Sequence, residues 1–326
     1  MEKVYDKPVN KTNPNLRRNN TMKKLFAILF AVAFIFGCLA MTACNKTEDS
    51  LDAAYTKYLN ECKQTNTDGL PTLTVATSPD FAPMEFVDIA KSGQEQYVGF
   101  DILLANYIAK ELGMKLVIKP MSFDACMAAV KTGSADLAIS GFSWTAERAE
   151  TFLITDWYKA GENETKQFII TTKANAGKLT KASDFSGLKV GAQGGSLQEL
   201  LVTEQLVPAG AQIVKMDNLN DLVTALKTGN IDALAVAKGN GDAFIADNKD
   251  SIDFSGFEFE IEEKYKNNVI LVNKNNSELC DKVNAALAKA MNAGVYDKWY
   301  EACQIYSGIK TKDELGYDDN GNKITE

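Results

Sequence analysis

The order of apolar and polar residues in the middle of the chain predicts strands and helices in alternation. Residues 73–77 alternate apolar and polar side chains, which indicates a strand, and residues 115–120 return as another. Between them, residues 102–112 show helical spacing, with Asp101 expected as N-cap and Gly113 as the stop. This alternation is typical of a parallel α/β sheet, whose ligands bind beyond the carboxyl ends of the strands.

A weak internal repeat predicts a second lobe of the same design. The sequence AVKTGSADLA (residues 129–138) recurs as ALKTGNIDAL (residues 225–234), each time as a helix end, a glycine stop and an aspartate before a buried strand. Two apolar extended runs, residues 167–172 and 268–272, are long enough to cross between the lobes as hinge strands.

The stretch of residues 136–158 is expected to organise a binding site. An apolar strand (residues 137–139) leads into a Ser140-Gly141 turn, and Thr145 is placed as the N-cap of the next helix. Arg148 then lies at the same rim, where its planar guanidinium could bind a carboxylate with two parallel hydrogen bonds. A surface salt bridge is the alternative for any single arginine.

A second anion-binding turn is expected in the other lobe. The strand at residues 188–192 runs into Gln193-Gly194-Gly195-Ser196, where the glycines let the backbone approach a ligand. Ser196 would begin the helix of residues 197–205 and leave its first N–H groups facing that ligand. No Gly-Lys-Ser/Thr follows, so the turn is not a phosphate loop.

Four motifs together resemble the type II periplasmic solute-binding proteins, in the branch that binds polar amino acids for ATP-driven importers. They are TLTVATSPDFAPMEF, VGFDILLANYIAKELG, DLAISGFSWTAERAETFLITDWY and LKVGAQGGSLQEL, and the resemblance covers about residues 70–303. It implies a two-lobed periplasmic-binding-protein-like II fold of the α/β class. Each lobe would have a central, mostly parallel sheet with helices on both faces, and two hinge strands would join them. Lobe 1 would span residues 70–168 and 270–306, and lobe 2 residues 169–269.

The resemblance also implies roles for individual residues. Arg148 would pair with the ligand α-carboxylate, assisted by Gly141 and Ser143 and, across the cleft, by Ser196 and the N–H of Leu197. Two aromatic positions, Phe81 and Phe123, would enclose the ligand side chain, although each could be plain core. The specificity candidates are Ser78, Gln193 and Gln198. Relatives that bind amides or cations often carry Asp where this chain has Ser78, which disfavours a strongly cationic ligand.

The sequence departs from the family pattern after the strand of residues 233–236. Amino-acid binders usually carry there an Asp that pairs with the ligand α-ammonium, and this chain has Ala237. Because an unpaired buried ion is strongly disfavoured, two hypotheses follow. Either Asp242, in a Gly-Asn-Gly-Asp turn, substitutes, or the ligand is a carboxylate without a free α-ammonium. We favour an amino acid bound partly through Asp242.

The first 43 residues are expected to be an export leader. Met22 is the preferred start, followed by a basic pair, an apolar run (residues 25–39) and a Met-Thr-Ala-Cys site that resembles a lipoprotein box. Cys44 would be lipidated and become the mature N-terminus; a transmembrane anchor is the alternative, but the run is short of about 20 residues. Residues 44–69 would be a polar tether, in which residues 51–62 could form a short helix, and residues 307–326 would be an acidic tail.

Charge and composition exclude several classes of function. Removing the first 43 residues takes away seven of the 35 Lys and Arg but two of the 43 Asp and Glu, so the net charge falls from −8 to −13. Such acidity argues against nucleic acid and for a soluble, exported monomer. The chain has no histidine and no Cys-x-x-Cys, which nearly excludes zinc and histidine-dependent catalysis, and no cofactor or metal is expected.

Four cysteines remain outside the leader, and their pairing cannot be deduced from sequence. Cys126 is expected as a buried free thiol, whereas Cys280 and Cys303 could form a bridge; Cys62 is the fourth.

The sequence thus predicts the extracytoplasmic binding component of an ABC importer, not an enzyme. It would capture a small polar amino acid or related carboxylate, deliver it to a permease and its ATPase, and stay lipid-anchored to the outer face of the cytoplasmic membrane. The alternatives are a non-amino-acid carboxylate, a ligand-sensing module or, least favoured, a dehydratase-like enzyme.

Overall fold

The computed structural model describes residues 45–158, 165–318 and 323–324. The chain divides into two compact units, residues 1–52 and 53–326. The expected leader and the proposed lipidation site at Cys44 lie outside the described residues. The larger unit contains both lobes.

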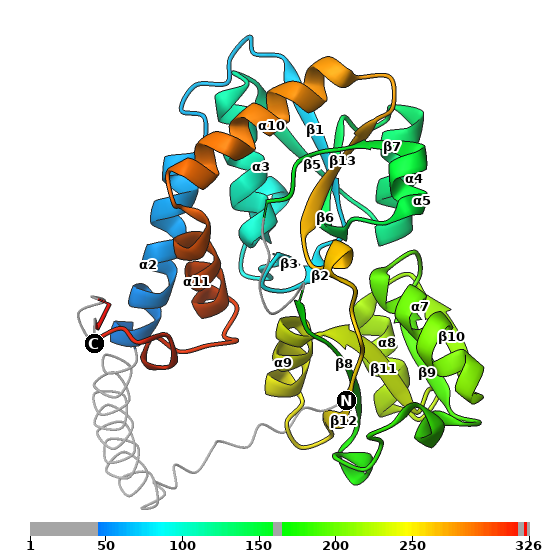
Figure 1. The fold of residues 1–326 in the computed structure, drawn as a ribbon. Helices are drawn as coiled ribbons and strands as arrows, with labels where there is room; N and C mark the ends of the chain where they lie inside the picture. Colours follow the sequence, from blue (N-terminus) through cyan, green and yellow to red (C-terminus); the bar gives the residue numbers. More distant parts are fainter. Residues whose placement is uncertain (1–44, 159–164, 319–322, 325–326) are drawn as a thin grey trace, which may run out of the picture. The chain divides into compact units, whose positions relative to one another are not determined.

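The central sheet of lobe 1 has five strands in the order β5-β1-β6-β13-β7 (Figure 1). β1 is parallel to β5 and β6, whereas β13 runs antiparallel to β6 and β7. A small antiparallel sheet, β2-β3-β4, lies at its edge. The strands are β1 (Thr72–Thr77), β2 (Asp80–Phe81), β3 (Glu85–Val87), β4 (Tyr97–Val98), β5 (Lys115–Pro120), β6 (Leu137–Ser143), β7 (Phe152–Ile154) and β13 (Asn268–Asn273).

Helices cover both faces of this sheet because each face has its own apolar cluster. One cluster combines residues of α3 (Phe100–Glu111), α10 (Ser277–Asn292) and α11 (Tyr296–Tyr306). The other forms around α4 (Phe123–Thr132), and the short helix α5 (Ala146–Thr151) follows β6.

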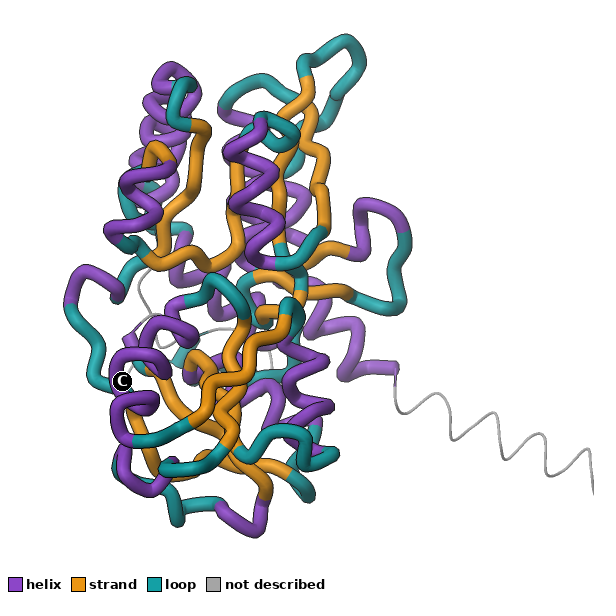
Figure 2. The backbone as a smooth tube through the Cα atoms, turned by 90° about the vertical axis from the view of Figure 1, so that its right-hand side faces the viewer, coloured by secondary structure: helices purple, strands orange, loops and turns teal. Residues whose placement is uncertain are grey.

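The sheet of lobe 2 also has five strands, in the order β10-β9-β11-β8-β12 (Figure 1). Figure 2 shows strands bordered by helices in both lobes. β9, β10 and β11 are parallel, and β8 pairs antiparallel with β11 and β12. Apolar clusters again lie on both faces. The elements are β8 (Gln167–Thr172), β9 (Lys189–Gln193), β10 (Gln212–Met216), β11 (Ala233–Ala237), β12 (Ile252–Glu258), α7 (Leu197–Leu201), α8 (Leu219–Lys227) and α9 (Lys238–Asp247).

Short turns of helix complete the described chain. They are η2 (Gly93–Gln96), η3 (Lys173–Asn175), η4 (Ala182–Phe185), a π-helical turn η5 (Val202–Leu206), η6 (Val207–Ala209), η7 (Glu263–Tyr265) and η8 (Asp313–Leu315). The two-lobed α/β fold expected from the sequence is confirmed, and both expected hinge runs are strands, β8 in the second sheet and β13 in the first.

The segment expected as a polar tether contains the short helix expected around residues 51–62. Helix α2 (Asn45–Cys62) runs through it, and within residues 53–62 Tyr55 and Cys62 are buried in the lobe 1 core. The Tyr55 hydroxyl accepts a hydrogen bond from the Gly99 N–H (3.0 Å). Part of the expected tether is therefore an integral helix of lobe 1.

Three local predictions are corrected by tertiary packing. Gly99, not Asp101, is the N-cap of α3, and the N–H groups of Phe100 and Asp101 donate to the Pro83 and Met84 carbonyls. The expected Gly-Asn-Gly-Asp turn is the first part of helix α9; a Cβ on Gly241 would lie 2.9 Å from Val236, so glycine permits close packing rather than a turn. Finally, no bridge forms between Cys280 and Cys303: both are free and buried, as are Cys62 and Cys126.

Candidate functional site

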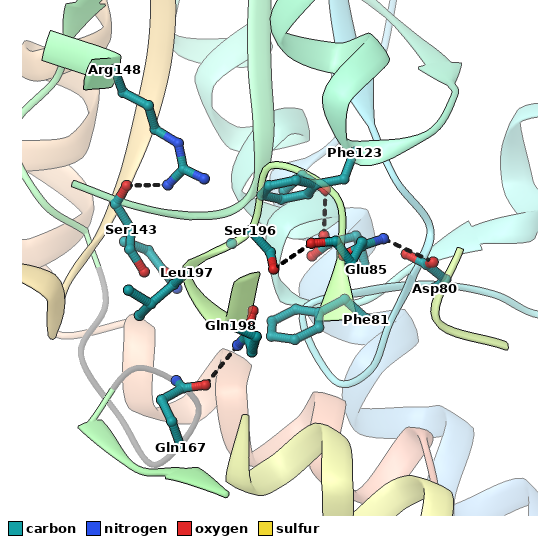
Figure 3. A pocket seen from close by; sticks show the side chains of 14 residues that line it. Asp80, Phe81, Glu85, Phe123, Ser143, Arg148, Gln167, Ser196, Leu197 and Gln198 are labelled. Carbon is teal, nitrogen blue, oxygen red and sulfur yellow. Dashed lines mark hydrogen bonds between the residues drawn. The ribbon is translucent and has the colours of Figure 1, made fainter. Parts of the chain in front are cut away.

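A pocket lies between the two lobes, where several strands end (Figure 3). It brings together most of the site residues expected from the sequence. Its lining residues are Asp80, Phe81, Glu85, Phe123, Ser140, Gly141, Ser143, Arg148, Gln167, Gln193, Ser196, Leu197, Gln198 and Asn268.

Arg148 is a buried cation in the wall of the pocket. It is 5 % exposed, not at an open rim as the sequence suggested, and burial lowers its pKa to about 10. Its guanidinium donates to the Ser143 carbonyl and, across the cleft, to the Gly195 carbonyl (2.8 Å). It also lies over the Phe123 and Phe142 rings, 5.6 and 5.2 Å from their centroids. Within the described residues Arg148 forms no ion pair, so its charge is balanced only by dipoles and ring faces.

Two local signals position Arg148. Thr145 caps α5 as expected, its hydroxyl accepting from the Arg148 N–H (3.2 Å). The expected Ser140-Gly141 turn is instead a bulge within β6, which continues to Ser143 while its register with β13 shifts. Gly141 has φ +55°, a conformation that favours glycine, and the bulge directs the end of β6 toward the pocket.

The aromatic residues pack as one wall. Phe123 stacks on Phe142 with 4.4 Å between ring centroids. Phe81 lies against the backbone of Gly141, where a Cβ would approach its ring to 3.1 Å. Both Phe81 and Phe123 thus line the pocket while contributing to packing.

The lobe 2 side of the pocket is built on the Gly194-Gly195 turn. Ser196 caps α7 as expected: its hydroxyl accepts from the Glu199 N–H (3.1 Å) and donates to the Gln193 carbonyl (2.7 Å). Leu197 is the first residue of α7 and lines the pocket with Ser196. The N–H groups of a first helical turn have no partner inside the helix, which suits an anionic ligand group.

Two expected site residues lie outside the pocket lining. Ser78 is buried behind it, donating to the Asp80 carboxylate (2.9 Å). Asp242 forms an ion pair with Lys238, one turn earlier in the same helix α9. Ala237 ends β11 as a buried apolar residue.

Sequence reasoning missed two carboxyl groups, Asp80 and Glu85. Asp80 directly precedes Phe81, an expected site residue, so its position in the sequence could have drawn attention to it. Burial raises the pKa of Asp80 despite its hydrogen bonds. Figure 3 shows both carboxyl groups on one side of the pocket and Arg148 on the other. The pocket is therefore polarised, with a cation facing two acids.

Glu85 forms a buried acidic pair with Asp101, which does not line the pocket. Its carboxylate accepts from the Ser140 hydroxyl, and burial with the neighbouring Asp101 raises its pKa well above the usual range. Asp101 accepts from the Gly141 N–H (2.8 Å) and the Tyr158 hydroxyl (3.0 Å), yet burial raises its pKa to about 7. The two groups thus retain protons where exposed carboxyls have lost them.

The starts of the two hinge strands were also missed as site residues. Gln167 begins β8 and Asn268 begins β13, and both line the pocket. Gln198 donates to the Gln167 side chain (2.6 Å). No sequence motif marked these positions; their role follows only from where the chain crosses between the lobes.

The described residues contain no helix long and apolar enough to span a membrane. They also contain no cluster of His, Cys, Asp and Glu side chains that could hold a metal ion.

Comparison with known proteins gives consistent matches. The family model of the bacterial extracellular solute-binding proteins, family 3, matches residues 73–302. A probable histidine-binding protein of Campylobacter jejuni is 31 % identical, over 76 % of this chain and 90 % of the relative. The arginine-binding extracellular protein ArtP of Bacillus subtilis is 28 % identical, over 70 % of this chain and 78 % of ArtP.

Solved structures agree with these sequence matches. An amino acid ABC transporter substrate-binding protein, AbpA of Streptococcus pneumoniae bound to L-arginine, superposes with a TM-score of 0.65 at 33 % identity, over 74 % of this chain and 97 % of AbpA. An ancestral arginine-binding protein bound to arginine gives 0.62 at 35 % identity, over 71 % and 96 %.

Proposed function

Because the chain belongs to the bacterial extracellular solute-binding proteins of family 3, we propose that it captures a small polar amino acid between its lobes for an ABC importer. Its family and relatives are binding proteins, not enzymes. The observation that carries the proposal is Arg148, a buried cation in the pocket wall without an acidic partner in the described chain.

A ligand carboxylate would complete the surroundings of Arg148. Two of its five N–H groups already hold backbone carbonyls, which fix the plane of the guanidinium and leave the others for the ligand. A charge-assisted, bidentate pair in this buried place would be much stronger than a surface pair. The Ser196 turn across the cleft supports the same carboxylate.

We place the ligand ammonium on the acidic side of the pocket. Asp242 is paired with Lys238 and does not line the pocket, so the substitution for Ala237 that the sequence favoured has no support from the geometry. Glu85 lies opposite Arg148 and lines the pocket, and its carboxyl oxygens can accept hydrogen bonds from an ammonium group. Ser78 alone disfavours a cationic ligand side chain, but the acidic side of the pocket is compatible with one. Relatives named for arginine and histidine support a cationic amino acid as the ligand.

The remaining parts of the proposal concern partners. We propose that the loaded protein docks on a permease driven by an ATPase, as a monomer, and that Cys44 carries the lipid that holds it at the outer face of the cytoplasmic membrane. The amino acid ABC transporter relatives support the permease, and the sequence of residues 22–44 supports the anchor.

A thermal-shift panel of the common amino acids tests the function. The panel should include arginine, histidine and glutamine, together with citrulline and des-amino analogues of each hit. We expect at least one amino acid to raise the melting temperature and its des-amino analogue to fail. Des-amino compounds that bind equally well would favour the carboxylate alternative suggested by Ala237. A panel without any hit, repeated by calorimetry, would contradict amino-acid capture.

A further inference from the structure

The tip of the small sheet in lobe 1 reaches across to lobe 2. Phe81, in β2, packs against the lobe 1 core and also against the lobe 2 cluster that contains Leu219 and Leu222. Asp80 precedes it and is buried, 7 % exposed. These two residues form a contact between the lobes that is separate from the bridge between Arg148 and Gly195.

The carboxylate of Asp80 is held mainly by lobe 2. Its Oδ2 accepts from the backbone N–H of Leu219 (2.8 Å) and from the Gln193 side chain (3.2 Å). Its Oδ1 accepts from Ser78 within lobe 1 (2.9 Å), which fixes the side chain toward lobe 2. Separation of the lobes would remove both donors from Oδ2 and leave only the Ser78 contact.

The lobe 2 donor is well suited to a carboxylate. Leu219 is the first residue of α8, a nine-residue helix, and its N–H has no partner within the helix. The N-cap Asn218 satisfies a different N–H, that of Asn220 (2.8 Å). A negative charge at this position is also favoured by the helix dipole. Asp80 thus caps, from the other lobe, an N–H that α8 does not cap for itself.

We propose that Asp80 is a positioning residue that stabilises the closed arrangement of the lobes over the pocket, rather than a direct ligand of the bound solute. The role deepens the proposed function, because a solute enclosed between the lobes can leave only when they separate. Arg148 differs: it would keep its Ser143 contact in the same lobe and present its remaining N–H groups to the solute. The two sides of the cleft therefore have different tasks, closure at Asp80 and solute recognition at Arg148.

The test measures closure without any solute, so it is independent of the ligand panel. Cysteines replacing Lys131 in α4 and Thr203 in η5 carry spin labels; both positions are exposed and line the same groove from opposite lobes. The protein without these two cysteines is the labelling blank, since its described thiols are buried. Double electron–electron resonance then gives the populations of short and long distances.

Asp80→Asn is the main variant, since it keeps the shape and removes the charge. We expect the ratio of closed to open molecules to fall about three- to tenfold. Asp221→Asn is the matched control, because Asp221 is an exposed acid in the first turn of the same helix and should leave the ratio unchanged. Equal ratios in Asp80→Asn and Asp221→Asn, or a parent protein with only the long distance, would overturn the proposal.

Leu219→Pro tests the same contact from lobe 2, should Asp80→Asn fail to fold. Proline is tolerated at the first position of a helix and lacks the N–H that Asp80 accepts. We expect the closed population to fall in the same direction. A closed population equal to that of Asp221→Asn would argue against the role of this hydrogen bond.

Discussion

The buried acidic pair of Glu85 and Asp101 should make the folded protein less stable as the pH rises from about 4 to about 7. Asp101 has no exposed surface, and burial raises its pKa to about 7, whereas an aspartate in an unfolded chain has a pKa of about 3.9. Over this range the native state binds a proton that the unfolded chain has released. The free energy of unfolding therefore falls as pH rises and levels off above the folded pKa.

The pKa difference of Asp101 sets the magnitude at roughly 4 kcal/mol across the whole window. Glu85 acts in the same direction, since its pKa is also raised by burial and by Asp101. This is a large share of the stability of a typical domain, about 5–15 kcal/mol. Burying these two acids at the pocket should therefore lower the stability of the folded protein by a measurable amount near neutral pH.

Urea denaturation followed by circular dichroism, at several pH values between about 4 and 8, provides the assay. Asp101→Asn removes the titration while its side-chain oxygen can still accept from the Gly141 N–H. All other titrating groups are shared, so the difference between the two proteins isolates Asp101 and its effect on Glu85. We expect the parent to lose stability relative to the variant as pH rises. Parallel curves would refute the assignment of raised pKa values.

Four further predictions follow from the site. Arg148→Lys keeps the charge but loses the planar fork, so calorimetry should show at least tenfold weaker amino-acid binding; unchanged affinity would mean that Arg148 does not bind the carboxylate. Asp242→Asn should leave affinity within about twofold, because Asp242 pairs with Lys238 and does not line the pocket; a large loss would restore the hypothesis drawn from the sequence. Gly141→Ala should lower the free energy of unfolding by about 1–3 kcal/mol, given φ +55° and the nearby Phe81 ring; an unchanged denaturation midpoint would exclude strain. Cys44→Ala should move the protein from the membrane fraction to the soluble fraction, and a variant that stays membrane-bound would contradict lipidation.

Local signals in the sequence predicted those features that depend only on residues nearby in the chain. Thr145 and Ser196 cap their helices as predicted, because a cap needs only its own side chain and the next turn. The strands predicted at residues 73–77 and 233–236 appear in β1 and β11 with nearly the same bounds. Arg148, Phe81 and Phe123 were predicted from the family resemblance, and all three line the pocket.

Predictions failed where distant segments meet. Asp101 resembles an N-cap, but the Pro83 and Met84 carbonyls accept from the N–H groups of Phe100 and Asp101, so the helix begins earlier and Asp101 is buried. Asp80 was not predicted as a site residue, since nothing local shows that the Leu219 N–H would donate to it across 139 positions of sequence. The lobe 2 acid at Asp242 was chosen by proximity in sequence, yet helix geometry directs it to Lys238 instead. Tertiary contacts of this kind have no periodic or capping signature.

The burial of residues 53–62 in lobe 1 has a mechanical consequence. Tyr55 and Cys62 anchor this part of α2 in the lobe 1 core, and Tyr55 is joined to Gly99 at the start of α3. Any pull on the chain ahead of residue 53 therefore enters the larger unit through lobe 1. Such a force does not act across the pocket. In a molecule attached to a surface through the residues ahead of 53, lobe 2 could therefore move relative to lobe 1 without opposing the attachment.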